Sequence, residues 1–177
     1  MKILGIDPGT GRLGWAVVES RASNVGSQAK KKRQMPSAKR PTALVACGLI
    51  ETLAHTPLAE RLEVIYKGIQ DIIKEYKPEE LAIEELFFVK NVKTAISVSQ
   101  ACGVAILASS LKGLKIFEYK PNVIKMAITG YGHAGKDQIV KMLKLHLKGC
   151  KIKQDDTADA VGVALCHLQS RKSKIKK

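Results

Sequence analysis

The stretch KILGIDPGTGRLGWAVVES, residues 2–20, decides the fold class. Residues 2–7 form a short apolar run that ends in an aspartate, a pattern typical of a buried strand. Residues 8–13 contain a proline and two glycines and therefore predict a turn. Residues 14–20 form a second strand-like run, and two strands joined by a tight turn predict an antiparallel hairpin. Residues 9–14 also match G-x-G-x-x-G, but a strand-like run follows instead of a helix, which argues against a dinucleotide site.

Downstream of the hairpin, the sequence alternates between strands and helices. Residues 42–53 predict a third strand that continues the meander. Thr56-Pro57 predicts an N-cap and a proline at the first helical position of an amphipathic helix that ends at Tyr76. The remaining elements are expected to be a strand over 80–84, an apolar helix over 92–111, a strand over 114–119, helical turns around 121–128 and 136–147, and a final helix from about 155 to 169.

This order of elements predicts an α/β fold with a mixed five-stranded sheet. A three-strand antiparallel meander would adjoin two parallel strands, which need crossover helices, and helices would cover both faces. The first and fourth strands are expected to be neighbours. The helix over 92–111 carries one charge, Lys93, so we expect it to pack against the sheet on one side and against a partner subunit on the other.

The 177 residues are expected to form one domain over residues 1–170. Segment 21–41 holds seven Lys and Arg residues and no acid, and we expect it to be a basic, mobile insertion. Residues 171–177 are expected to be a basic, disordered tail. Neither a membrane-spanning stretch nor a signal peptide is expected, so the sequence predicts a cytoplasmic protein.

The net charge of +14 is unevenly distributed. Residues 90–153 carry twelve lysines and only two acids. Outside this segment, the insertion and the last eight residues, the chain carries six bases and fourteen acids. A basic half beside an acidic half predicts a surface that binds a polyanion next to a cluster of carboxylates. Nucleic acid is the expected partner.

Four carboxylates occupy positions where α/β proteins build sites. Asp7 ends the first strand, Glu84 ends the fourth, and Asp156 and Asp159 share one face at the start of the final helix. Each also has an ordinary explanation: Asp7 can start a turn, Glu84 can be a solvated strand end, and acids at a helix start are favoured by the helix dipole.

Together, these four carboxylates predict a metal site. Acids that converge repel one another unless divalent cations neutralise them. Oxygen ligands favour Mg²⁺ or Mn²⁺. Two such ions about 4 Å apart can activate a water molecule and stabilise the leaving oxygen in phosphodiester hydrolysis. The four acids are therefore candidate catalytic and metal-ligating residues of a nuclease that holds two ions.

Five motifs occur in order along the chain: Gly5-Ile-Asp-Pro-Gly9, Ala82-Ile-Glu84 followed by Phe87, Gln100-Ala-Cys-Gly-Val-Ala105, Phe117-Glu-Tyr119, and Asp156-Thr-Ala-Asp159-Ala. Through them the chain resembles the RuvC family of bacterial Holliday junction resolvases, over about residues 1–20 and 42–170. The resemblance implies a ribonuclease H-like fold and a homodimer that binds a four-way DNA junction. It also implies symmetric cutting of two opposing strands with Mg²⁺, and partnership with the RuvA–RuvB branch-migration complex.

The resemblance assigns roles to individual positions. The family's four catalytic acids match Asp7, Glu84, Asp156 and Asp159. Its aromatic residue that contacts bases at the junction centre matches Phe87. Its two functional lysines match Lys125 and Lys136. Arg12, in the turn after the first strand, is a further candidate DNA contact. The insertion at 21–41 departs from the family pattern, and we expect its bases to add salt-sensitive affinity for DNA.

Two alternative functions stay open. A YqgF-like nuclease that acts on RNA shares the fold and a similar first strand. A non-catalytic nucleic-acid-binding module would share the fold without the activity. The Asp-x-x-Asp helix and the long apolar helix favour the RuvC-like resolvase, and the presence of all four acids favours an enzyme.

Overall fold

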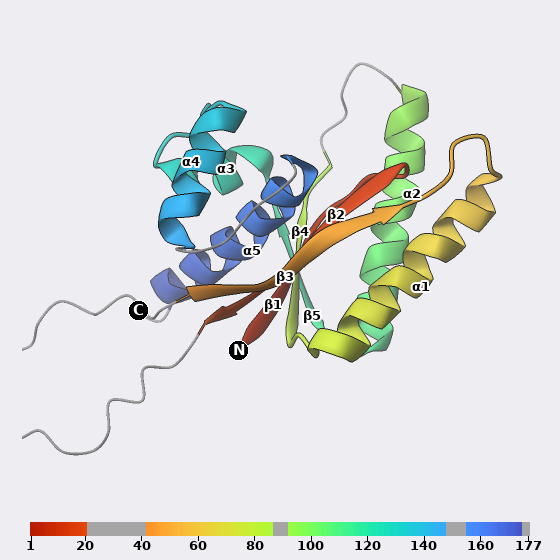
Figure 1. Ribbon diagram of the computed structural model, residues 1–177, viewed down its shortest axis with the longest axis horizontal. Coiled ribbons are helices and arrows are strands. Elements are labelled where there is room, and N and C mark those ends of the chain that lie inside the picture. The colour runs from red at the N-terminus through yellow and green to blue at the C-terminus, as the bar shows by residue number, and fades with distance from the viewer. Residues whose placement is uncertain (21–41, 87–91, 148–154, 175–177) are drawn as a thin grey trace, which may run out of the picture.

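In the described part of the chain, five strands form one mixed sheet in the order β3-β2-β1-β4-β5 (Figure 1). The computed structural model describes residues 1–20, 42–86, 92–147 and 155–174, with only the backbone at 92, 93, 155, 156 and 172–174. The strands are β1 (Lys2–Asp7), β2 (Arg12–Ser20), β3 (Thr42–Glu51), β4 (Glu80–Glu84) and β5 (Lys115–Tyr119). The helices are α1 (Leu58–Tyr76), α2 (Val92–Leu111), α3 (Pro121–Thr129), α4 (Lys136–His146) and α5 (Asp155–Lys174).

Strand β1 lies at the centre of the sheet and has neighbours of both directions. It runs antiparallel to β2 and parallel to β4, and β4 runs parallel to β5. Strand β2 also pairs antiparallel with β3, with a bulge between Val17 and Val18. The predicted meander, the two parallel strands and the pairing of the first strand with the fourth are therefore confirmed.

Alternate residues of the central strands face two separate cores. In β1, Leu4 and Ile6 belong to the core shared with α1 and α2, whereas Ile3 belongs to the core under α3, α4 and α5. Figure 1 shows α1 and α2 on one face of the sheet and the other three helices on the opposite face. The predicted covering of both faces is confirmed. Because strand side chains alternate, Asp7 shares the face of Ile3 and α5.

Helix α1 follows the predicted amphipathic pattern but begins differently. Its buried residues recur at helical spacing: Ile65, Ile69, Ile72 and Ile73. Pro57 is the N-cap instead of the first helical residue, and no side chain caps the helix. The Thr56 hydroxyl donates to the carbonyl of Leu53. The predicted threonine cap is therefore wrong, because Thr56 closes the preceding turn instead.

Helix α2 is apolar all round, but only one side is buried. Ala101, Ala105 and Ala108 belong to the core shared with α1. The opposite side carries three large apolar residues that are each more than half exposed: Ile96, Leu107 and Leu111. By length and composition alone, Thr94–Leu111 is long and apolar enough to cross a membrane, a test that the core helix of a soluble protein also passes. The buried side nevertheless packs against the sheet as a core helix does.

Helix α5 is longer than predicted and takes up part of the expected tail. It continues to Lys174, so the prediction of disorder from residue 171 is wrong as far as residue 174. Arg171 pairs with the carboxylate of Glu80 at the start of β4. The same carboxylate lies 2.7 Å from Nε2 of His167, whose Nδ1 lies 2.6 Å from the Tyr119 hydroxyl. This network ties the last turns of α5 to the sheet. The predicted insertion at 21–41 and residues 175–177 lie outside the described residues.

Candidate active site

The carboxyl ends of β1 and β4 place two acids at one edge of the sheet. The strands are parallel, and Ile6 of β1 pairs with Ile83 of β4. Asp7 and Glu84 are the next residues and the last of their strands. Both point to the face of α5, because Ala82, two residues before Glu84, belongs to the core under that helix. Neighbouring strands therefore bring two half-buried acids together.

Helix α5 approaches β1 closely at Gly5, two residues before Asp7. A Cβ on Gly5 would lie 2.3 Å from the carbonyl oxygen of Ala160 and 2.8 Å from the Cβ of Ala164. Only glycine allows backbones to approach this closely. Asp159 directly precedes Ala160, so this contact carries Asp159 to the edge where β1 and β4 end.

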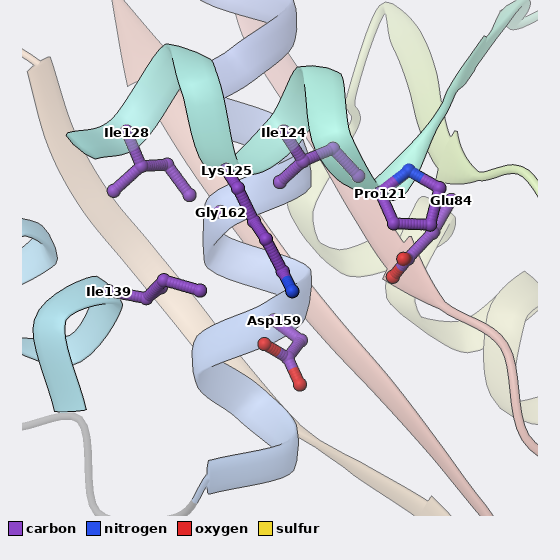
Figure 2. A pocket seen from close by; sticks show the side chains of 8 residues that line it. All are labelled: Glu84, Pro121, Ile124, Lys125, Ile128, Ile139, Asp159 and Gly162. Carbon is purple, nitrogen blue, oxygen red and sulfur yellow. The ribbon is translucent and has the colours of Figure 1, made fainter. Parts of the chain in front are cut away.

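A small pocket lies at this edge, among α3, α4, α5 and the end of β4 (Figure 2). Figure 2 shows Glu84 and Asp159 entering it from β4 and α5, and the ammonium group of Lys125 reaching toward Asp159 from α3. The lining residues are Glu84, Pro121, Ile124, Lys125, Ile128, Ile139, Asp159 and Gly162. Two acids and a lysine therefore share a pocket with apolar walls.

Negative charge in this pocket is not fully balanced. Burial raises the pKa of Glu84 above its ordinary value, and the neighbouring charge of Asp159 raises it further. The positive charge of Lys125 acts in the opposite direction, but the pKa remains raised. A raised carboxyl pKa means that the ionised form lacks compensating positive charge. A divalent cation beside Glu84 would supply that charge.

The donor set fits a hard cation. Carboxylate oxygens are the ligands that Mg²⁺ and Mn²⁺ prefer, and Asp7, Glu84 and Asp159 offer them at one edge. Of the four predicted acids, the structure brings Glu84 and Asp159 into one pocket and Asp7 to the adjacent strand end. The side chain of Asp156 lies outside the described residues. Among the side chains that are described, no three His, Cys, Asp or Glu residues are grouped closely enough to hold a metal ion.

The predicted DNA-contacting residues lie at several places. Lys125 lines the pocket itself instead of an outer surface. Lys136 is exposed at the first residue of α4. Arg12 is exposed at the start of β2, with its Nε 3.3 Å from the carboxylate of Glu51. Phe87 lies outside the described residues.

The apolar wall of the pocket is the part that sequence reasoning missed. Ile124 and Ile128 of α3 and Ile139 of α4 form it. Their spacing predicts a buried helix face, but it does not say which acids lie beside that face. A signal was available in Gly162, a glycine within the apolar run 160–166 of α5, because a Cβ there would lie 2.7 Å from Cδ1 of Ile128.

Comparison with known proteins gives a consistent result. The family model for crossover junction endodeoxyribonuclease RuvC matches residues 3–167. The crossover junction endodeoxyribonuclease RuvC of Brachyspira hyodysenteriae is 47% identical, with 94% of this chain and 93% of the relative covered. The protein of that name from Pelotomaculum thermopropionicum is 41% identical, with 99% and 100% covered.

Solved structures show the same likeness. The structure of Thermus thermophilus RuvC in complex with Holliday junction substrate has a TM-score of 0.83 and 26% identity, with 98% of this chain and 96% of that chain covered. A second Thermus thermophilus RuvC structure has a TM-score of 0.81 and 27% identity, with 98% and 97% covered. The predicted ribonuclease H-like fold and the resemblance to RuvC are therefore confirmed, and the YqgF-like alternative is not favoured. The chain belongs to the RuvC family of crossover junction endodeoxyribonucleases.

Proposed function

We propose that this chain is an endonuclease that resolves four-way DNA junctions by metal-dependent hydrolysis of phosphodiester bonds, in recombination and repair. The observation that carries the proposal is the meeting of Glu84, Asp159 and Lys125 in one pocket where parallel strands end, in a chain of the RuvC family. The lysine-rich half of the sequence suits the DNA phosphates around such a site. The Thermus thermophilus relative, described in complex with Holliday junction substrate, supports a junction as the substrate.

Asp7, Glu84, Asp156 and Asp159 would hold Mg²⁺ or Mn²⁺, with two ions in each site. Bound there, the ions would supply an activated water molecule and stabilise the leaving oxygen. The raised pKa of Glu84 supports this role, since a carboxylate that lacks positive charge gains most from a cation. Protonation of Glu84 would compete with the ion, so metal affinity should fall as the pH falls.

Lys125 would act on the phosphate that is cut. Its ammonium group reaches into the pocket from α3, and its charge acts on Glu84. A lysine in this place attracts the phosphate and stabilises the negative charge that develops on its oxygens. The isoleucine side chains beside it form an apolar wall, and apolar surroundings strengthen the attraction between the ammonium group and the phosphate.

Other residues would hold the junction around the cut. Phe87 would stack on an unpaired base, an interaction worth about 1–3 kcal/mol. Lys136 and Arg12 are exposed and would contact the phosphate backbone. Arg12 would exchange its Glu51 partner for a phosphate, a small cost because both side chains of that ion pair are largely exposed.

We propose that two copies of the chain pair through the exposed side of α2. Ile96, Leu107 and Leu111 lie on this side, and a dimer would bury their apolar surface. Gly103 lies between them, and apart from its own stretch of helix no described atom comes within 4 Å of the position of a Cβ there, which leaves room for a second helix. A dimer would offer two sites to one junction, as symmetric cutting requires.

We also propose that the chain cooperates with the RuvA–RuvB branch-migration complex and acts in the cytoplasm.

The test compares a mobile four-way junction with a linear duplex of the same sequence, with Mg²⁺ and with EDTA. We expect paired nicks in the junction only, and only with Mg²⁺. Asp7→Asn should bind the junction with nearly unchanged affinity and should not cut it. Asp71→Asn, the same change on the exposed side of α1, is the matched control and should cut normally.

The alternatives give different outcomes in this assay. Cutting of an RNA substrate in preference to the junction would support a YqgF-like nuclease. Junction binding without cutting by the unmodified chain at any Mg²⁺ or Mn²⁺ concentration would support a non-catalytic binding module. Cutting by Asp7→Asn at the rate of the unmodified chain would show that the proposed metal site is wrong.

A further inference from the structure

The turn from residue 8 to residue 11 follows Asp7 directly and joins β1 to β2. Thr10, in this turn, is only 6% exposed. Gly9 makes the turn tight, because a Cβ there would lie 2.1 Å from the carbonyl oxygen of Arg12. The position of this turn therefore sets the direction in which the backbone continues after Asp7.

One side of the turn is hydrogen-bonded to helix α2. The Thr10 hydroxyl donates to the hydroxyl oxygen of Ser97 over 3.1 Å. The Ser97 hydroxyl in turn donates to the carbonyl oxygen of Thr94, one turn earlier in α2, over 3.0 Å. The Ser97 hydroxyl is thus oriented to accept from Thr10, 87 positions away in the sequence.

The other side of the turn is hydrogen-bonded to the segment that joins β3 to α1. The backbone N–H of Thr52 donates to the carbonyl oxygen of Gly11 over 3.0 Å. The Thr52 hydroxyl donates to the carbonyl oxygen of Thr10 over 2.6 Å and accepts from Nε of Arg61 over 2.8 Å. Helix α2 and the segment after β3 therefore both hold the turn in place, and Arg61 of α1 in turn holds the Thr52 hydroxyl.

From this arrangement we propose that Thr10 and Ser97 are positioning residues for Asp7. Their hydrogen bond fixes the turn against α2 and so holds the Asp7 carboxylate where it binds the metal ion. The inference rests on the proposed function, in which Asp7 is a metal ligand. It assigns a task to two hydroxyl groups that do not line the pocket.

The expected loss is moderate, because one neutral hydrogen bond is removed and the backbone contacts with Thr52 remain. The affinity for Mn²⁺ should fall roughly fivefold in Thr10→Val and in Ser97→Ala, which corresponds to about 1 kcal/mol for such a bond. The double variant should lose no more than either single variant, because both changes break the same bond. The affinity for the junction in EDTA should be unchanged.

The test measures Mn²⁺ binding to the DNA-free protein by electron paramagnetic resonance, together with amide hydrogen exchange in the turn. Thr10→Ser keeps the donor hydroxyl and should restore both the affinity and the protection of the turn. Ser170→Ala is the matched control for Ser97→Ala, because its hydroxyl also bonds a carbonyl in its own helix, that of Cys166, over 2.9 Å. This control should bind Mn²⁺ as the unmodified chain does.

The possible outcomes separate this inference from the proposed function. If the unmodified chain binds Mn²⁺ and Asp7→Asn does not, but Thr10→Val and Ser97→Ala bind normally, the positioning role is wrong and the metal site stands. Failure of Thr10→Ser to recover affinity would also overturn the role. If Asp7→Asn binds Mn²⁺ as tightly as the unmodified chain, the proposed function itself fails. Ser97→Ala keeps the test decisive if Thr10→Val does not fold, because alanine is favourable within a helix.

Discussion

The contact between Gly5 and α5 makes a strong prediction about how the site is assembled. In Gly5→Ala the new Cβ would lie 2.3 Å from the carbonyl oxygen of Ala160, whereas ordinary contacts of a Cβ begin at 3.4 Å. The obstacle is helix backbone and cannot rotate away, so α5 must retreat from β1 by about 1 Å. Such overpacking costs about 1–3 kcal/mol of unfolding free energy.

The same displacement should impair cutting more than it impairs folding. Asp159 is the residue before Ala160, so it moves with the helix away from Asp7 and Glu84. A misplacement of about 1 Å in a catalytic site can cost about 100-fold in rate. We therefore expect Gly5→Ala to cut a saturating junction about 100-fold more slowly in single-turnover assays, while urea unfolding shows a folded but weakened protein.

A glycine substitution without a clash is the control for the stability measurement. Gly135 has φ −76°, which suits any residue, and nothing lies within 4 Å of the position of a Cβ there. Because Gly135 is the N-cap of α4 and alanine caps a helix less well than glycine, Gly135→Ala should lower the unfolding free energy by no more than about 1 kcal/mol and should leave the rate of cutting unchanged. If Gly5→Ala is as stable as the unmodified chain and cuts as fast, then the approach of α5 to β1 does not position Asp159.

Three further predictions concern other parts of the molecule. Because the pKa of Glu84 is raised on folding, the metal-free protein should lose stability as the pH rises through the pKa of Glu84 in the folded state. In EDTA at pH 7, Glu84→Gln should therefore unfold at a higher urea concentration than the unmodified chain, whereas at pH 4 it should not. Unfolding of Glu84→Gln at a lower urea concentration than the unmodified chain at pH 7 would contradict this. Leu107→Glu should give monomers in sedimentation at concentrations where the unmodified chain and Val64→Glu, a change at another exposed apolar residue, on α1, are dimers. His167→Ala should cost about 3 kcal/mol in urea unfolding, because it opens a cavity and removes the hydrogen-bond partner of Tyr119; a cost below about 1 kcal/mol would refute this.

Local sequence patterns predict most of the fold because strands and helices follow from the period of apolar residues. The run before Asp7, the helix that ends at Tyr76 and the helix over 92–111 occur where those patterns place them. The pairing of the first and fourth strands followed from the rules that connect parallel strands. Helix boundaries were less predictable: Thr56 uses its hydroxyl in a turn, and Arg171 extends α5 by pairing with a distant acid.

The site was only partly predictable, because its geometry depends on long-range packing. The acids at strand ends could be named from the sequence, since strand ends and helix starts are recurrent places for sites. The position of Lys125 inside the pocket depends on how α3 lies across α5, which no local pattern specifies. The contact of Thr10 with Ser97 joins two polar residues that are unremarkable in the sequence and become informative only when the turn and α2 are seen together.

The most direct test of the central claim is anomalous diffraction from crystals of this chain that contain Mn²⁺. We predict an anomalous peak at the carboxyl ends of β1 and β4, with carboxylate oxygens of Asp7, Glu84 and Asp159 within about 2.5 Å of it. The peak should disappear in Asp7→Asn. A fully occupied Mn²⁺ site elsewhere, with none among these three residues, would contradict the account.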